Sequence, residues 1–163
     1  MMYETMIILS LAIAATGAGL MAGVYFAFSC FIMNAFDELG SARAADAMNS
    51  INRVILRSAF MVVFFGSTLL YAALGLIALL DTDLANRGLL ILISGLYITG
   101  MFLSTVVFNV PLNNQLAAAT GEQIEIDRSW PYYLKHWTRW NHLRGVCSLL
   151  TLILSGVFLV TSS

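Results

Sequence analysis

Four stretches of the sequence carry no charged side chain, and they constrain the fold more than any other feature. They cover positions 5–36, 58–80, 88–121 and 145–163. A helix needs about 20 apolar residues to cross the hydrocarbon core of a bilayer. Charged residues make up only 10% of the chain, against about 25% in soluble domains. The sequence therefore predicts an integral membrane protein of the all-α class, a bundle of four transmembrane helices.

Turn residues and flanking charges set the expected boundaries. We expect helices over about 3–36, 42–80, 88–120 and 130–161, which form a single domain over residues 1–163. Ser41 is a suitable N-cap for the second helix, which we expect to run unbroken. Pro111 predicts a kink near 107–109, because proline removes a backbone hydrogen bond and crowds the preceding turn. Pro131 suits the first turn of the fourth helix, after a polar loop at Glu122–Asp127.

The basic residues predict how the chain is oriented in the membrane. Seven of the eight Lys and Arg residues lie in the connections 37–57 and 122–144. Cytoplasmic loops are enriched in these residues, so we expect both connections in the cytoplasm and both termini outside. All four helices then extend past the membrane on the cytoplasmic side, and the expected location is the inner membrane of a bacterium. The net charge of −1 gives no electrostatic argument for nucleic acid as a partner.

Small residues recur every four positions in the first helix and predict a groove where another helix backbone approaches closely. They are Ala15, Gly19, Gly23 and Ala27. A second interpretation of this face is self-association into a homo-oligomer. Both cysteines, Cys30 and Cys147, lie in apolar sequence and are expected to be buried, unreactive thiols.

The fourth segment carries an unusual polar stripe where it enters the membrane. Trp137, Trp140, Asn141, Arg144 and Ser148 follow helical spacing and share one face. Since the Arg144 charge lies next to a spanning segment, it needs a partner or water. One interpretation is a polar, inward-facing site. The other is an interfacial belt, in which the tryptophans lie at the membrane surface and the arginine reaches lipid phosphates.

The third segment supplies a complement at the same depth. Asn109 and Asn113 are four residues apart and therefore share a helix face. Two amides at this depth are costly unless they form hydrogen bonds. They can bind a ligand, bond each other, or satisfy the carbonyl that Pro111 frees.

The first two segments reach the same level from the other side. Asn34 lies near the end of the first, while Asn52 and Arg57 lie near the start of the membrane part of the second. Beneath this polar layer we expect apolar side chains: Phe26, Phe28, Phe31, Met33 and Met61. An apolar cavity with a few convergent polar groups is the usual form of a small-molecule site.

The two histidines give no support for a metal. His136 and His142 are six residues apart, which places them on different faces of one helix. His142 is the only candidate for a near-neutral base at the level of the polar layer, and its alternative role is that of a solvent-facing interfacial histidine. The sequence contains no nucleophile elbow, phosphate loop or dinucleotide fingerprint.

Four motifs together resemble the anthrone oxygenase-like family of small four-helix membrane proteins. They are Gly-x-x-x-Gly-x-Tyr-Phe-x-Phe-Ser at 19–29, Met-Asn-Ser-Ile-Asn at 48–52, Asn-Val-Pro-Leu-Asn at 109–113 and Trp-x-x-Trp-Asn-x-x-Arg at 137–144. The resemblance covers nearly the whole chain. It implies oxidation of an anthrone to an anthraquinone by molecular oxygen without an added cofactor, as in fungal members. Asn109, Pro111, Asn113, Trp140, Asn141 and Arg144 match the family pattern, whereas His142 does not belong to it.

We therefore expect a cofactor-independent oxygenase that acts on a flat, apolar, phenolic or quinone-like molecule from the bilayer. The expected catalytic residues, which stabilise an enolate or accept its proton, are Asn109, Asn113, Asn141, Arg144 and His142. The expected substrate-binding residues are Trp137, Trp140, Asn52, Arg57 and Phe28. The main alternative is a non-catalytic binding or accessory protein for a quinone, a lipid or another hydrophobic metabolite. An exporter ranks last, because the spanning segments lack acidic residues.

Overall fold

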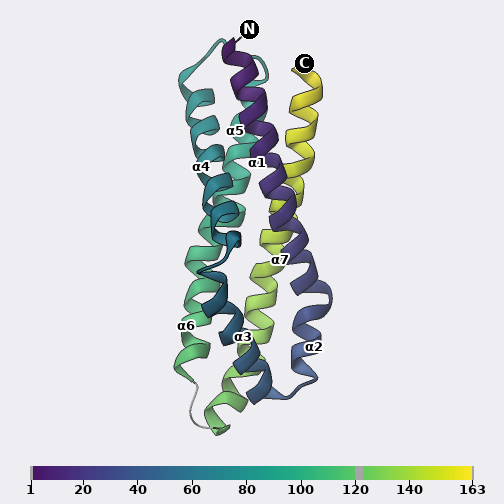
Figure 1. Cartoon of the computed structure of the whole chain (residues 1–163), viewed down its shortest axis with the longest axis vertical. Helices are drawn as coiled ribbons and strands as arrows, with labels where there is room; N and C mark the ends of the chain where they lie inside the picture. The colour runs from purple at the N-terminus through teal and green to yellow at the C-terminus, as the bar shows by residue number, and fades with distance from the viewer. Residues whose placement is uncertain (1, 120–122, 163) are drawn as a thin grey trace.

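The described part of the chain, residues 2–119 and 123–162 of a computed structural model, consists of helices joined by short turns and forms one elongated bundle (Figure 1). In chain order the elements are α1 (Met2–Ala27), η1 (Phe28–Ile32), α2 (Met33–Asp37), α3 (Ser41–Ile55), α4 (Ala59–Leu80), α5 (Arg87–Leu96), η2 (Tyr97–Leu103), η3 (Thr105–Asn109), α6 (Val110–Ala118) and α7 (Gln123–Thr161). The elements named η are π-helical turns that continue the neighbouring α-helices without interruption.

Four helical stretches of the described residues are long and apolar enough to cross a membrane. They are Met2–Asp37, Ala59–Leu80, Arg87–Ala118 and Gln123–Thr161. Both ends of the chain lie at the same end of the bundle, as an even number of spans requires (Figure 1). The all-α fold with four spanning helices, predicted from the charge-free stretches, is confirmed.

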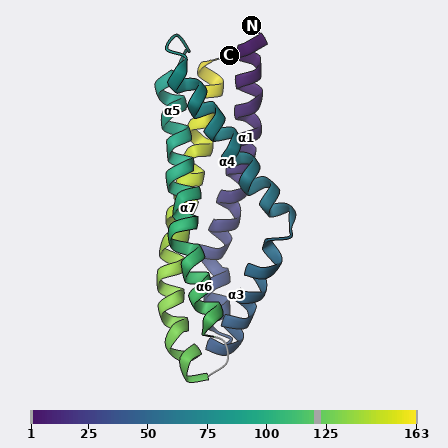
Figure 2. The ribbon, with the colours of Figure 1, turned by 90° about the vertical axis from the view of Figure 1, so that its left-hand side faces the viewer.

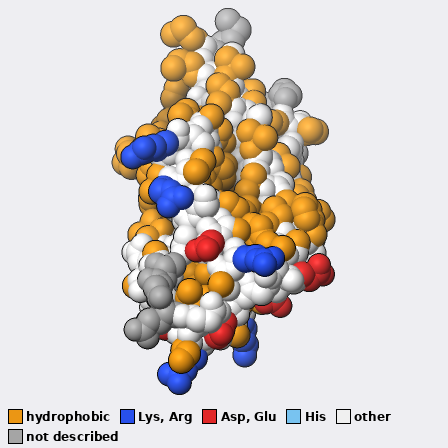
Figure 3. Space-filling model, turned by 60° about the horizontal axis from the view of Figure 1, so that its bottom comes forward, with side chains coloured by type: hydrophobic (Ala, Val, Ile, Leu, Met, Phe, Trp, Pro, Cys, Tyr) orange, Lys and Arg blue, Asp and Glu red, His pale blue; other side chains and the backbone are white. Residues whose placement is uncertain are grey.

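The surface has the polarity that a membrane protein needs. Large apolar side chains such as Leu20, Val62 and Leu69 are more than half exposed on the flanks. Charged side chains gather at the end away from the termini, while apolar side chains cover the flanks (Figure 3). Since no water is available beside the hydrocarbon core, an apolar flank and a charged end are what a bilayer favours.

The core lies along the bundle axis and depends on small residues, although not mainly on the stripe predicted from the sequence. A Cβ added at Gly17 would lie 2.7 Å from the Ser67 Cβ, and one added at Gly100 would lie 2.3 Å from the Cys147 Sγ. By contrast, a Cβ added at Gly23 would meet nothing within 4 Å. The closest approach of the first helix to α4 is therefore offset from the predicted stripe, whereas Gly19 of the stripe faces α7, where an added Cβ would lie 3.4 Å from Leu152 Cδ2.

The second segment is not one helix, and this prediction was wrong. Helix α3 ends at Ile55, and the chain bends through 56–58 before α4 begins. The Ser58 hydroxyl donates to the Ile55 carbonyl oxygen at 2.8 Å and accepts from the Phe60 N–H at 3.3 Å, so it caps α4. This elbow bends outward from the bundle (Figure 2). Ser41 is also not the N-cap of α3, because Gly40 occupies that position with a φ of 82°, which suits glycine.

The third segment departs from α-helical geometry where Pro111 predicted it. The π turn η3 ends at Asn109, two residues before the proline. A π turn is wider than an α turn, so it accommodates a ring that would otherwise press on the preceding turn. The irregular backbone expected near 107–109 is thus present, and a second π turn, η2, lies directly above it.

The fourth segment begins earlier than predicted. Residues 123–127 are helical, so the predicted polar loop is wrong there, while Glu122 lies outside the described residues. Pro131 consequently lies inside α7 and not in its first turn. The Gln123 side-chain amide donates to Asp127 Oδ1 at 2.9 Å, and the Trp130 indole donates to Asp37 Oδ1 at 2.8 Å. These two bonds stabilise the added turns.

Candidate functional site

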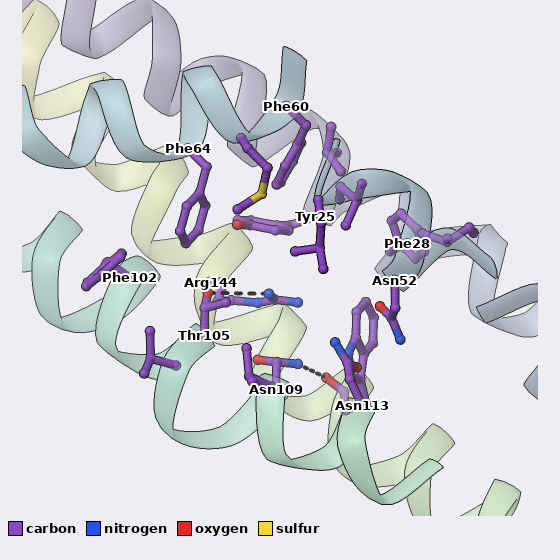
Figure 4. A pocket seen from close by; sticks show the side chains of 18 of the residues that line it. Tyr25, Phe28, Asn52, Phe60, Phe64, Phe102, Thr105, Asn109, Asn113 and Arg144 are labelled. Carbon is purple, nitrogen blue, oxygen red and sulfur yellow. Dashed lines mark hydrogen bonds between the residues drawn. The ribbon is translucent and has the colours of Figure 1, made fainter. Parts of the chain in front are cut away.

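A cavity of about 240 Å³ opens between the four helical stretches at the level of the α3–α4 elbow. Its lining is mostly apolar and aromatic, with a few polar side chains, and the main residues are labelled in Figure 4. The lining residues are Val24, Tyr25, Phe28, Met48, Ile51, Asn52, Ile55, Leu56, Phe60, Met61, Phe64, Phe65, Phe102, Thr105, Val106, Asn109, Val110, Asn113, Trp137 and Arg144. This composition is typical of a site for an apolar small molecule.

Arg144 projects from α7 into this cavity and is only 5% exposed. Its Nη2 donates to Asn141 Oδ1 at 2.8 Å, and its Nη1 donates to Thr105 Oγ1 at 3.4 Å. Its guanidinium carbon lies 4.4 Å from the centre of the Tyr25 ring and 5.1 Å from that of Trp137. All these contacting groups are uncharged. A buried cation that is held only by neutral groups favours an anion beside it.

Asn141 lies behind Arg144 and holds it in place. The Asn141 side chain is fully buried, and its Nδ2 donates to the Tyr25 carbonyl oxygen and to Ser29 Oγ, both at 2.7 Å. These bonds fall where the first helix changes from α to π geometry at Phe28. Asn141 does not line the cavity, so it is a positioning residue that joins α7 to the first helix and orients the guanidinium.

The two amides of the third segment both reach the cavity. Asn109 is buried, and its Nδ2 donates to the Trp137 carbonyl oxygen on α7 at 3.3 Å. Asn113 Oδ1 accepts from the Tyr133 hydroxyl at 2.8 Å. Both amides therefore bond to the neighbouring helix α7. In these two bonds they pair neither with each other nor with the carbonyl group that Pro111 frees.

Several polar atoms around the cavity are buried without a hydrogen-bond partner among the described residues. They are Asn52 Nδ2, Asn109 Oδ1, Trp137 Nε1 and Arg144 Nε. An unsatisfied buried polar group costs about 1–3 kcal/mol. Donors thus outnumber acceptors in this set, and a ligand that carries a hydroxyl or a carbonyl oxygen can satisfy them.

Other predicted site residues lie elsewhere. The Trp140 ring stacks on Phe108, with ring centres 3.6 Å apart, and does not line the cavity. Arg57 is exposed in the bend between α3 and α4. His142 is exposed and lines a separate groove between α1 and α7. The structure therefore does not bring these three residues to the polar layer.

The expected apolar floor and the expected cysteines also need correction. Of the five apolar residues expected beneath the layer, Phe28 and Met61 line the cavity, whereas Phe26 and Phe31 are exposed. Met33 is buried in a separate core cluster, and Asn34, expected in the polar layer, is exposed. Cys147 is buried as predicted, but Cys30 is exposed on the π turn η1.

Sequence reasoning missed two polar contributors. Tyr25 faces Arg144 from α1, and Thr105 lies one turn before Asn109 on the same side of the third segment. The spacing from Thr105 through Asn109 to Asn113 repeats every four residues and could have identified Thr105. Tyr25 lies in the motif at 19–29, but its place in the polar layer was not predicted, because an isolated tyrosine in an apolar helix is usually a packing residue. Within the described residues, no cluster of three His, Cys, Asp or Glu side chains could hold a metal ion.

Comparison with known proteins gives one match. A family model described as anthrone oxygenase matches residues 59–154, more than half of the chain. This range contains Thr105, Asn109, Asn113, Trp137 and Arg144, whereas the first helix and α3 lie before it. No curated protein and no solved structure matches the chain.

Proposed function

Because the chain belongs to the anthrone oxygenase family, we propose that its cavity binds a flat, apolar phenolic or quinone-like molecule and promotes its oxidation by molecular oxygen. The observation that carries this proposal is Arg144, a buried cation with uncharged contacts at the wall of an apolar cavity. An anthrone is neutral and apolar in the bilayer but becomes an anion when its enol form ionises. Arg144 stabilises that anion more than the neutral molecule, and such differential binding accelerates a reaction.

The first step is transfer of a proton from the methylene carbon of the substrate to a water molecule in the cavity. The electron pair of the broken C–H bond moves into the ring system, and the carbonyl oxygen becomes an enolate oxygen. Arg144 lies beside this oxygen, with the Asn52 amide N–H groups as a further donor. Phe28 and Trp137, whose ring centres are 5.5 Å apart, form an aromatic wall against which the ring system packs.

The second step is attack of the enolate carbon on oxygen. The new C–O bond forms a peroxide anion, which takes up a proton to become a hydroperoxide. The O–O bond of the hydroperoxide then breaks as the remaining C–H bond loses its proton. The C–H electron pair forms the C=O bond, and the terminal OH leaves as hydroxide and combines with that proton as water. Overall, a CH₂ group and O₂ become a C=O group and H₂O, so the electrons come from the substrate itself. An apolar cavity favours this step because molecular oxygen dissolves readily in apolar surroundings.

A specific observation also favours the alternative, binding without turnover. The described residues that line the cavity include no carboxylate and no imidazole that could accept the proton directly. A quinone, a lipid or a hydrophobic metabolite whose oxygen faces Arg144 would satisfy the same donors. In this second function the protein is a binding or accessory protein.

The test compares two arginines of the same helix. The purified protein is incorporated into lipid nanodiscs, and oxygen uptake and anthraquinone absorbance are followed with anthrone as substrate. Arg144→Gln removes the buried charge and is expected to lower kcat by about 100-fold or more, the typical loss for one transition-state donor. Arg139→Gln is the matched control, since Arg139 is exposed.

Three outcomes are informative. A selective loss of turnover in Arg144→Gln supports the oxygenase. Anthrone binding that quenches tryptophan fluorescence, without turnover above autoxidation in the unsubstituted protein, supports the binding protein instead. Equal rates in the unsubstituted protein and in Arg144→Gln would contradict a role for the buried charge.

A further inference from the structure

A second hollow lies between α3 and α6, on the water-facing side of the cavity. It has a volume of about 620 Å³ and is lined almost entirely by polar side chains: Asp46, Asn49, Asn52, Arg53, Asn113, Asn114 and Ala117. Asp46, Arg53 and Asn114 are exposed, so this polar groove opens to solvent. Asn52 and Asn113 line both the groove and the cavity. These two amides are therefore the partition between an apolar chamber and an aqueous one.

The partition and the adjoining groove contain polar atoms that the protein does not satisfy. Asn52 Nδ2 and Asn49 Oδ1, one turn apart on α3, are buried and have no hydrogen-bond partner among the described residues. Asn113 Oδ1 accepts from the Tyr133 hydroxyl at 2.8 Å. Ordered water molecules usually bind to such unsatisfied donors and acceptors between a polar groove and a cavity. An apolar plug would require no amides at this point.

About one turn farther from the groove, along the same two segments, the rim of the cavity is apolar. Leu56 is 65% exposed, Val106 48% and Val110 41%, and all three line the cavity. These apolar side chains face the surroundings of the bundle, where lipid chains are expected. The cavity thus has an apolar rim and a polar partition at different levels between α3 and the third segment.

We propose that Asn52 and Asn113 form a hydrated port through which water and protons pass between the cavity and the aqueous phase. The port is separate from the apolar rim, which an apolar substrate and oxygen use. This proposal rests on the proposed function, because the oxidation releases a proton early, takes one up later and produces water. A charged species does not leave through hydrocarbon at low cost. The port gives the proton a path through water to Asp46, the carboxylate at the outer part of the groove.

The test measures access of water to the cavity without any substrate. Trp137 lines the cavity, and its indole Nε1 is buried and unpartnered. Exchange of its indole hydrogen with D₂O is followed by NMR of the ¹⁵N-labelled protein in detergent micelles, with the resonance assigned by Trp137→Phe. Trp130, whose indole donates to Asp37 at 2.8 Å, is the internal reference for an intact fold.

Two leucine variants close the port, and a third is the matched control. Asn52→Leu and Asn113→Leu are each expected to slow exchange at Trp137 by about tenfold or more, because exchange then requires local opening. Exchange at Trp130 is expected to stay unchanged. Asn114→Leu leaves exchange at both tryptophans unchanged, since Asn114 lines the groove but not the cavity.

Unchanged exchange at Trp137 in both Asn52→Leu and Asn113→Leu would overturn the port. An equal slowing in Asn114→Leu would overturn it as well, because the effect would not be specific to the partition. The outcome is independent of turnover. If exchange slows in the variants but the protein does not oxidise anthrone, the result supports the port and contradicts the oxygenase proposal. If exchange is unchanged and the protein oxidises anthrone, only the port proposal is contradicted.

Discussion

Asn141 is the residue whose removal most directly tests how the site is held together. Its amide donates to the Tyr25 carbonyl oxygen and to Ser29 Oγ, and its Oδ1 accepts from Arg144 Nη2. Asn141→Leu keeps a similar volume and removes all three bonds. Neutral bonds between helices in a membrane contribute about 0.6 kcal/mol each. A bond to a charged group contributes about 1.5–3 kcal/mol. The expected loss in the free energy of unfolding is therefore about 3 kcal/mol.

The assay for this prediction is equilibrium unfolding of the purified protein in mixed micelles of increasing SDS content. The matched control is Asn114→Leu, because Asn114 is an exposed amide whose replacement should change the free energy of unfolding by less than about 0.5 kcal/mol. The same Asn141→Leu sample should also lose anthrone turnover while it retains Arg144, since the guanidinium is then no longer oriented. A loss below about 1 kcal/mol, within the range of a single neutral bond, would refute the reasoning that Asn141 joins the two helices and the cation.

Three further predictions concern packing, capping and the cavity wall. Gly100→Ala should lower the free energy of unfolding by about 1–3 kcal/mol by overpacking, because a Cβ at Gly100 would lie 2.6 Å from the Cys147 Cβ. Adding Cys147→Gly to this variant should restore part of the lost stability. Ser58→Ala should cost about 1 kcal/mol in the same assay through loss of the α4 cap, whereas Ser58→Asp should cost less. Phe28→Ala should raise the KM for anthrone about tenfold and affect kcat less, since it removes a wall that contacts substrate and transition state alike; an unchanged KM would place the substrate elsewhere.

The bundle could be predicted because its main determinant is the length of apolar sequence between charges. That length can be read directly from the sequence and does not depend on how the helices pack. The elbow at 56–58 could not be predicted in this way. The amphipathic pattern of α3 and the apolar pattern of α4 are both helical, and neither proline nor glycine separates them. Ser58 was the only signal, and a serine within a helical pattern is ambiguous because it can equally bond back to its own helix.

The site was predictable to the extent that one helix face determines it. Asn109 and Asn113 on the third segment, and Arg144 on the fourth, reached the cavity as their spacing indicated. His142 did not, and the reason is geometric, since two residues along a helix rotate the side chain by about 200° relative to Arg144. Trp140 lies at the edge of the same stripe, where it stacks on Phe108 and packs against the core cluster around Trp137 instead of lining the cavity. Such choices depend on neighbouring helices, which periodicity does not describe.

The cavity also explains why the matched family region alone does not define the site. Residues 59–154 contain the buried cation and the amides of the third segment. Tyr25, Phe28 and Asn52 come from the first helix and from α3, outside this range. The groups proposed to stabilise charge and the groups that shape the cavity thus come largely from different parts of the chain. Differences in substrate among related chains are therefore expected to arise mainly from α3 and Phe28, while Arg144 and its contacts Tyr25, Thr105 and Trp137 stay the same.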